Sequence, residues 1–182
     1  KDKYVALFNA QSNGDNLDFS HADYASPVIA GKGASQAIEV SVKEGKKLVL
    51  FVKDGGNGFD YDHAVWLNPT LHGPKGTLKL TSHKWMTATA GWGEARVNRT
   101  CDNRPLLIDG AAAEGIGTHS ESVIIYQLPE GYDTFTATGY VTQDRGSVVF
   151  GVLVDKGSME LSEIALVDIA FDAIGIQGKA TV

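Results

Sequence analysis

The chain has 182 residues, of which 43% are hydrophobic, and its net charge is −6. This length and composition fit one domain of ordinary size with a substantial core. We expect no nucleic-acid partner, because neutralising phosphates needs clustered Lys and Arg, and no membrane partner, because no apolar run is long enough to span a bilayer. The sequence opens at "KDKYVALF" without Met, and we expect it to be part of a longer protein.

Apolar residues alternate with polar ones, or come in short runs, along most of the chain. These runs are rich in Val, Ile, Phe, Tyr and Thr, and turn-like stretches such as "SNGDN", "EGKK", "HGPKG" and "PEGYD" separate them. Many short strands with turns between them are typical of an all-β protein, and we predict an antiparallel β-sandwich. The predicted strands cover residues 4–9, 37–42, 47–52, 77–81, 122–128, 134–141, 146–154 and 164–171.

Two stretches, 53–69 and 84–105, are dense in polar and aromatic residues and are predicted as long loops, which in a compact domain often carry function. Residues 82–90 could form one or two helical turns with Ser82 as N-cap. The stretch "GIGTHSES", 115–122, predicts a tight turn that presents His119 before an apolar strand.

The three Trp residues lie in the two predicted loops. Trp66 and Trp85 have apolar neighbours and are predicted to be core residues. Trp92 is flanked by glycines in "AGWGE" and is interpreted as a ligand or rim contact. Cys101 is the only cysteine, so no internal disulfide can form, and without an adjacent His it is interpreted as a structural thiol.

The sequence contains no Gly-x-Ser-x-Gly elbow and no His-x-His or His-x3-His spacing. Carboxylates are plentiful, but nothing in the sequence sets two of them at the separation that sugar hydrolysis needs. The acidic run "DGGNGFDYD", 54–62, lacks the final Glu of an EF-hand loop. Two interpretations of this run remain open: its acids are solvated turn residues, or they hold a Ca²⁺ ion together with loop carbonyl oxygens.

The remaining polar and aromatic residues suit recognition of a sugar, which offers hydroxyl groups and one apolar ring face. The set contains no activated nucleophile, so its chemistry favours binding over turnover. The candidates for such a surface are Asp60, His63, Trp92, Glu94, Asn98, Arg99, His119 and Glu121.

Residues 84–155 resemble the amino-terminal part of the NPCBM domains, the family 51 carbohydrate-binding modules. The resemblance rests on "GWGEARVNRT", "PLLIDG", "GIGTHSES" before an apolar strand, and "GSVVFGVLVD". It implies a galactose-binding-domain-like jelly roll. It further implies a non-catalytic module, attached to a glycoside hydrolase, that binds galactose-containing glycans, with bound Ca²⁺ as a family feature.

The resemblance leaves three roles open for His119: a hydrogen bond to a sugar hydroxyl, bracing of the turn, or a contact with an ion. Glu121 follows two residues later and is expected on the same face of an extended segment. Asn98 and Arg99 are expected to reach the same place from the preceding loop. Asp62 and His63 are expected to line the adjacent edge, beside Trp66.

The order of the family's segments is unusual here. Residues 37–71 resemble the family's carboxy-terminal piece, which carries an Asp-His-x-x-Trp segment, yet they come first. A circular permutation or the tail of a truncated preceding copy would explain this, and the chain length favours permutation, with "HGPKG" joining the old ends.

Residues 1–13 and 167–182 resemble strands of the carboxy-terminal β-domain of family 27 glycoside hydrolases, the α-galactosidase group. This predicts a binding module over 14–166, inserted in that β-domain, with the parent catalytic domain as a partner in cis. The alternative is a packing module that binds no sugar itself. The resemblance implies secretion or a periplasmic location in a bacterium, and no catalytic residue in this chain.

Overall fold

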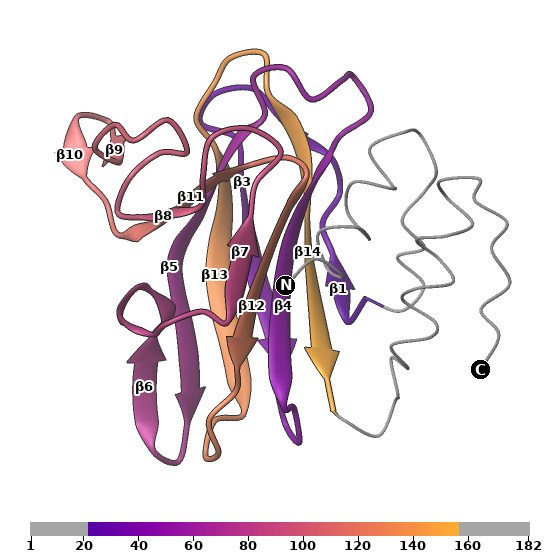
Figure 1. The fold of residues 1–182 in the computed structure, drawn as a ribbon, viewed down its shortest axis with the longest axis vertical. Coiled ribbons are helices and arrows are strands. Elements are labelled where there is room, and N and C mark those ends of the chain that lie inside the picture. The colour runs from indigo at the N-terminus through magenta and orange to yellow at the C-terminus, as the bar shows by residue number, and fades with distance from the viewer. Residues whose placement is uncertain (1–21, 157–182) are drawn as a thin grey trace, which may run out of the picture.

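The computed structural model describes residues 22–156, which form two facing β-sheets with long loops at one end (Figure 1). These residues contain no α-helix, only a 3₁₀ turn at Leu80–Ser82. The strands are β1 (Tyr24–Ala25), β2 (Ile29–Ala30), β3 (Ser35–Ser41), β4 (Lys47–Asp54), β5 (His63–Gly73), β6 (Gly76–Lys79), β7 (Thr87–Thr89), β8 (Arg96–Val97), β9 (Leu107–Ile108), β10 (Ala111–Ala112), β11 (Gly115–His119), β12 (Ser122–Gln127), β13 (Thr134–Val141) and β14 (Ser147–Asp155).

One sheet has the order β1-β14-β4-β12-β7, with β2 also paired to β14, and the other has the order β3-β13-β5-β11-β8, with β6 paired to β5. All pairs are antiparallel, and β9 and β10 form a separate hairpin. The predicted antiparallel sandwich is therefore confirmed, while its description as a jelly roll stays a prediction. The predicted strands at 4–9 and 164–171 and the module limits 14 and 166 lie outside the described residues.

The core lies between the sheets and is built around Trp66, which is fully buried. Its ring makes an edge contact with Phe150, at 4.9 Å between centroids, and lies 6.3 Å from Phe135. Trp85 is partly buried and packs against this core beside Tyr126. The prediction that Trp66 is a core residue is confirmed, and Trp85 lies at the margin of the core.

Strands β4 and β12 are apolar on both faces. Leu48, Leu50 and Ile124 belong to the main core, whereas the alternate residues Phe51 and Val123 belong to a second buried cluster. Since successive side chains of a strand point to opposite faces, these two strands carry buried apolar residues on both faces. This explains why their sequences are continuous apolar runs rather than strict alternations.

The loop predicted over 53–69 is wrong for residues 63–69, which belong to β5, a central strand of its sheet. Asn68 and Pro69 indicate a loop although they lie within β5, because proline is rare within sheets. The structure accommodates them with a register shift against β13, between Thr136 and Thr138, and with a positive φ of 47° at Asn68. The bulge keeps β5 paired on both sides of the proline.

The turn predicted at "GIGTHSES" is also wrong, because Gly115–His119 form strand β11, buried along its length. The glycine at 117 is needed for another reason: a Cβ there would lie 2.1 Å from the carbonyl oxygen of Arg99, whose backbone crosses the strand. The helical turns predicted over 82–90 are absent too, and Thr87–Thr89 pair with β12 as β7.

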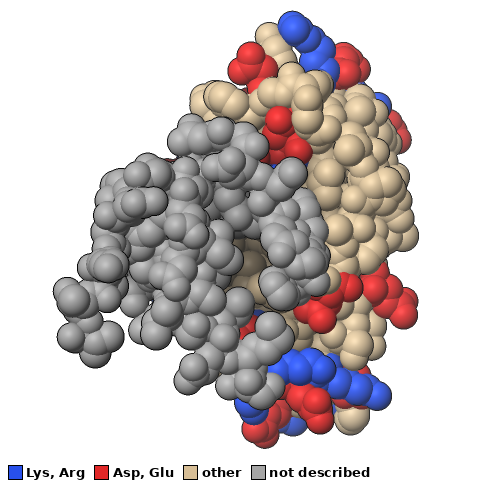
Figure 2. Space-filling view, turned by 90° about the vertical axis from the view of Figure 1, so that its right-hand side faces the viewer, with Lys and Arg blue, Asp and Glu red and all other residues tan. Residues whose placement is uncertain are grey.

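At the upper end of the sandwich, strands β4, β11 and β13 finish and strands β5, β12 and β14 begin. The loops over 55–62 and 142–146 lie there, at the top of Figure 1. On the face drawn in Figure 2, charged side chains of the described residues gather near the upper end and over the lower part, with a tan area between them.

Candidate functional site

A hollow of about 350 Å³ opens at this end of the sandwich. This volume falls at the lower limit of small-molecule sites, which span roughly 300–1,000 Å³. Aromatic rings and imidazoles make up most of its wall, and three of the rings are about half exposed: Phe59 (55%), Tyr61 (47%) and Trp92 (49%). The complete lining is Phe59, Asp60, Tyr61, His63, Trp92 and His119.

The two histidines are positioned by neighbouring strands. His63 is the first residue of β5 and His119 the last of β11, and the antiparallel register places them directly opposite each other. Their ring centroids are 5.2 Å apart, and the indole of Trp92 lies 5.4 Å from His63 and 5.8 Å from His119. Phe59 closes the group at 6.2 Å from His119.

Close backbone packing holds the loop that carries Trp92. A Cβ at Gly91 would lie 2.2 Å from the carbonyl oxygen of Ser120, and a Cβ at Gly93 would lie 2.4 Å from that of Cys101. Only glycine permits approaches this close. Gly91 and Gly93 therefore allow the backbone on either side of Trp92 to pack closely against the end of β11 and against the 98–104 loop.

The hydrogen bonds of the two imidazoles leave complementary groups for a ligand. His119 Nδ1 lies 2.7 Å from the carbonyl oxygen of Ser120, which can only accept, so Nδ1 carries the proton and Nε2 is an acceptor. His63 Nδ1 lies 3.3 Å from the thiol of Cys101. Because an imidazole nitrogen accepts better than a thiol sulfur, we assign the thiol as donor, which makes His63 Nε2–H a donor. A ligand with several hydroxyl groups can accept a hydrogen bond from His63 Nε2–H and donate one to His119 Nε2.

Burial lowers the pKa of His63 and of His119 below the ordinary value of 6.5, and the neighbouring imidazole lowers that of His63 further. Both rings are therefore neutral at pH 7. Since the unfolded chain takes up these protons first as the pH falls, the stability that the two rings contribute is present above about pH 6.5 and is lost below it.

We predict that NMR titration of the imidazole C–H signals of His63 and His119 will give midpoints below 6.5. Affinity for a hydroxyl-bearing ligand should stay constant above this pH and fall as the rings protonate, because protonated His119 no longer accepts at Nε2. A His119 midpoint at or above 6.5 would contradict the assigned burial.

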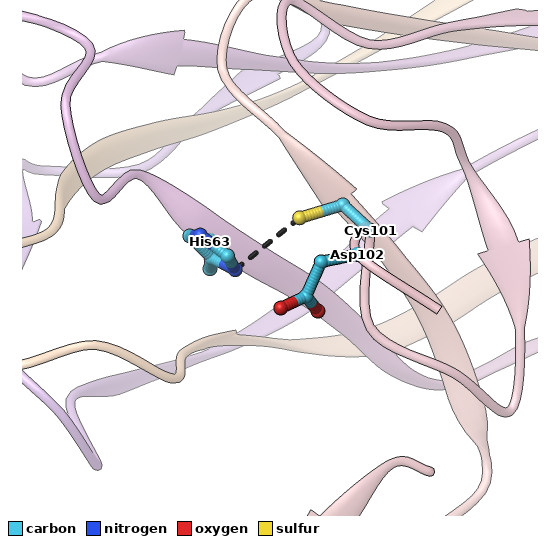
Figure 3. Close-up of side chains that lie close together, drawn as sticks. All are labelled: His63, Cys101 and Asp102. Atoms are coloured by element: carbon cyan, nitrogen blue, oxygen red, sulfur yellow. Dashed lines mark hydrogen bonds between the residues drawn. The ribbon is translucent and has the colours of Figure 1, made fainter. Parts of the chain in front are cut away.

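Figure 3 shows His63, Cys101 and Asp102, whose potential ligand atoms lie within 4.8 Å of one another. The Asp102 carboxylate accepts hydrogen bonds from the Thr100 hydroxyl and from Arg104 Nη2, the latter at 2.7 Å. Burial raises the pKa of the Cys101 thiol to about 12, so the thiol stays protonated. Each member of the group already has a hydrogen-bond partner, and the group braces the back of His63.

This donor set does not fit the Ca²⁺ ion that the family resemblance implies. Calcium takes six to eight oxygen ligands, whereas this group offers a nitrogen, a sulfur and one carboxylate. It is the one group of three or more His, Cys, Asp and Glu donors found within residues 22–156. We therefore derive no role for calcium at this site.

The structure brings four of the predicted site residues together in the hollow, namely Asp60, His63, Trp92 and His119. Three others lie outside it. Glu94 is exposed and pairs with Arg96 at 2.6 Å, while Asn98 Oδ1 accepts from the Gly115 N–H at 3.0 Å. Arg99 donates from Nη1 to the carbonyl oxygen of Asn103 at 2.8 Å.

Two further predicted residues, Asp62 and Glu121, face the protein interior. Asp62 is fully buried and accepts hydrogen bonds from the Ser120 hydroxyl, at 2.6 Å, and from the Ser147 N–H, at 2.8 Å. Glu121 Oε1 accepts from the Asp54 N–H at 3.2 Å, and burial raises the pKa of this carboxyl. Both carboxyl groups link neighbouring segments at the upper end of the sandwich.

Sequence reasoning missed Phe59 and Tyr61 as individual site residues. The available signal was their position: two large aromatic residues in a glycine-rich, acidic turn, "GNGFDYD", where burial of both is difficult. Tyr61 has a φ of 70°, which is unusual for a bulky residue and typical of a constrained functional loop.

An antiparallel β-sandwich with a hollow of aromatic rings and paired hydrogen-bonding groups at one end defines a binding module. A family model described as NPCBM/NEW2 domain matches residues 11–72 and 76–170, more than half of the chain, and the chain therefore belongs to this family. Membership indicates a carbohydrate-binding module. No curated protein and no solved structure matched the chain. No helix within the described residues is long and apolar enough to cross a membrane.

Proposed function

We propose that this chain is a non-catalytic module that binds galactose-containing glycans in the hollow between Trp92 and the pair His63 and His119. The observation that carries the proposal is the half-exposed indole beside two neutral imidazoles, one assigned as a donor and the other as an acceptor at Nε2. A sugar ring needs this combination of an apolar platform and hydrogen-bonding groups of both kinds.

Galactose suits the hollow because its axial 4-hydroxyl leaves the C–H groups at C3, C4 and C5 together on one ring face. That face would pack on Trp92. The hydroxyl groups would then meet His63 Nε2–H, His119 Nε2 and the exposed Asp60 carboxylate, which all lie in the lining. A charged acceptor such as Asp60 makes the stronger hydrogen bond to a hydroxyl.

Binding without turnover is supported by the carboxylates. A glycosidase of the usual kind places two carboxyl groups on opposite sides of the scissile bond. Asp60 is the single carboxylate in the lining, while the buried Asp62 and the half-buried Glu121 accept hydrogen bonds from other segments of the chain.

The proposed parent is a secreted or periplasmic bacterial glycoside hydrolase of the α-galactosidase type, with the module inserted in its β-domain and circularly permuted. Two observations support insertion and permutation. The first and last described strands lie side by side, with Tyr24 opposite Val152. The family match breaks at 73–75, within the turn that joins β5 to β6. Adjacent ends are what insertion and permutation require. A parent protein without α-galactosidase activity would contradict this context.

Titration calorimetry of the purified chain against galactose, lactose and blood-group-type oligosaccharides tests the proposed function. We expect dissociation constants of roughly 10–1,000 µM, because a shallow site buries little area. The affinity should be the same with EDTA as with added Ca²⁺, since none of the contacts proposed for the sugar passes through an ion. Absence of heat with every glycan would contradict sugar binding and favour the role of a packing module.

A further inference from the structure

A second hollow of about 400 Å³ lies beside the first and shares two lining residues with it, Asp60 and Tyr61. The rest of its wall comes from the end of β2 and the turn after it, from Asn57 of the 55–62 loop, and from the loop between β13 and β14. Its side-chain groups are polar: the Asn57 amide, the carboxylates of Asp60 and Asp144, and the Arg145 guanidinium. The two hollows therefore differ in chemistry, the first aromatic and the second polar.

Tyr61 separates the two hollows, and contacts within the 55–62 loop and with the 142–146 loop fix its position. Its carbonyl oxygen accepts from the His63 N–H at 2.7 Å, and a Cβ at Gly146 would lie 2.5 Å from that oxygen. The Arg145 guanidinium lies over the phenol ring, 4.8 Å from its centroid. This contact holds the ring against the 142–146 loop, so the common wall is part of the folded structure.

We propose that the module recognises a glycan of at least two units, with one ring on Trp92 and the next ring beyond Tyr61 in the second hollow. This inference rests on the proposed function and deepens it. Amide, carboxylate and guanidinium groups around a hollow suit a ring whose surface is mostly hydroxyl. A single sugar unit in the first hollow would leave these groups unused.

The charges of the second hollow specify a neutral second unit. Two carboxylates, Asp60 and Asp144, face one guanidinium, so the lining carries an excess of negative charge. A uronic or sialic acid in this position would be repelled by this excess of negative charge. A neutral hexose or an N-acylated hexosamine carries no charge and is not repelled.

The test compares methyl β-galactoside, lactose, a neutral trisaccharide ending in galactose, and a sialylated galactoside, each titrated into the intact chain. The neutral oligosaccharides should bind at least threefold more tightly than the monosaccharide, since one or two added hydrogen bonds have this effect. The sialylated sugar should bind no more tightly than the monosaccharide.

Arg145→Ala should weaken oligosaccharide binding about three- to tenfold. Because this guanidinium also holds Tyr61, which lines the first hollow, Asp144→Ala, at a residue that lines the second hollow alone, is the variant expected to leave the methyl galactoside affinity unchanged. Arg99→Ala is the matched control, because its guanidinium bonds to the Asn103 carbonyl outside both hollows. Asp144→Ala serves as a second variant should the first unfold, with circular dichroism checking the fold of each.

Equal affinities for monosaccharide and neutral oligosaccharides, with no effect of Arg145→Ala, would overturn the second subsite and leave the proposed function standing. Tighter binding of the sialylated sugar would overturn the neutral assignment. Failure of every sugar to bind the unaltered chain would overturn both proposals together.

Discussion

Trp92→Ala will weaken glycan binding at least tenfold, which corresponds to about 1.4 kcal/mol. The indole is 49% exposed at the mouth of the hollow, so it is free to cover the apolar face of a sugar ring. Truncation removes this platform while leaving both imidazoles in place. Aromatic contacts of this kind are a main source of affinity in small polar ligands, because hydrogen bonds to hydroxyl groups largely replace bonds to water.

The fold should tolerate this change. Trp92 lies outside the main core, and its replacement should alter the free energy of unfolding by roughly 1 kcal/mol or less. Leu107→Ala is the matched control, because Leu107 is a similarly exposed apolar residue of β9. Calorimetry and thermal unfolding of both variants are the measurements. Unchanged affinity in Trp92→Ala would place the sugar elsewhere.

His119→Ala differs from this change because the ring is only 3% exposed. Its loss leaves a space beneath the hollow, so both binding and stability should decline. The exposed and buried members of the site thus need different controls.

Asp62→Asn is expected to change the pH dependence of stability by about 3 kcal/mol. Burial raises the pKa of Asp62 from 3.8 to about 6, and the hydrogen bonds from Ser120 and Ser147 lower it by less. Between these values the folded protein keeps a proton that the unfolded chain has released. A shift of this size corresponds to about 3 kcal/mol between the two protonation states.

The sign follows from the direction of this shift. Stability contributed by Asp62 is fully present below about pH 3.8 and is lost as the pH rises through about 6. Asparagine does not titrate, so the stability of the original chain relative to Asp62→Asn should fall across this window and be flat above pH 7. Comparison with the variant also removes the opposite contribution of the two histidines.

Urea unfolding of both proteins at pH values from 4 to 8 measures this difference. Ser120→Ala supplies a second comparison, because the Ser120 hydroxyl donates to Asp62 and lowers its pKa. Without that hydroxyl, the window should move to higher pH. A difference between the original chain and Asp62→Asn that does not vary with pH would show that the carboxyl is ionised throughout.

The sequence predicts those strands that are regular alternations or short apolar runs between clear turn signals. The prediction of 134–141 coincides with β13, and those of 37–42 and 47–52 overlap β3 and β4 with small differences at the ends. It fails where local signals and tertiary pairing disagree. Asn68 and Pro69 indicate a loop, yet pairing on both sides of the bulge makes β5 a central strand.

For the site, residue chemistry was sufficient to select His63, Trp92 and His119, but not to decide which polar groups face outward. Asp62 and Asp60 are two residues apart in one acidic turn. One is fully buried under Ser120 and Ser147, and the other is exposed in the hollow. Composition gives both the same expected role, and only the positions of β11 and β14 distinguish them.

The opposition of His63 and His119 across β5 and β11 has a consequence for how this module can diversify. The two imidazoles are anchored by the ladder itself, whereas Phe59, Tyr61 and Arg145 belong to the connecting segments. Exchange of those segments between relatives would retarget the module to other saccharides without dismantling its anchoring pair. Selection experiments can therefore vary residues 55–61 and 142–146 in libraries while His63 and His119 stay unchanged.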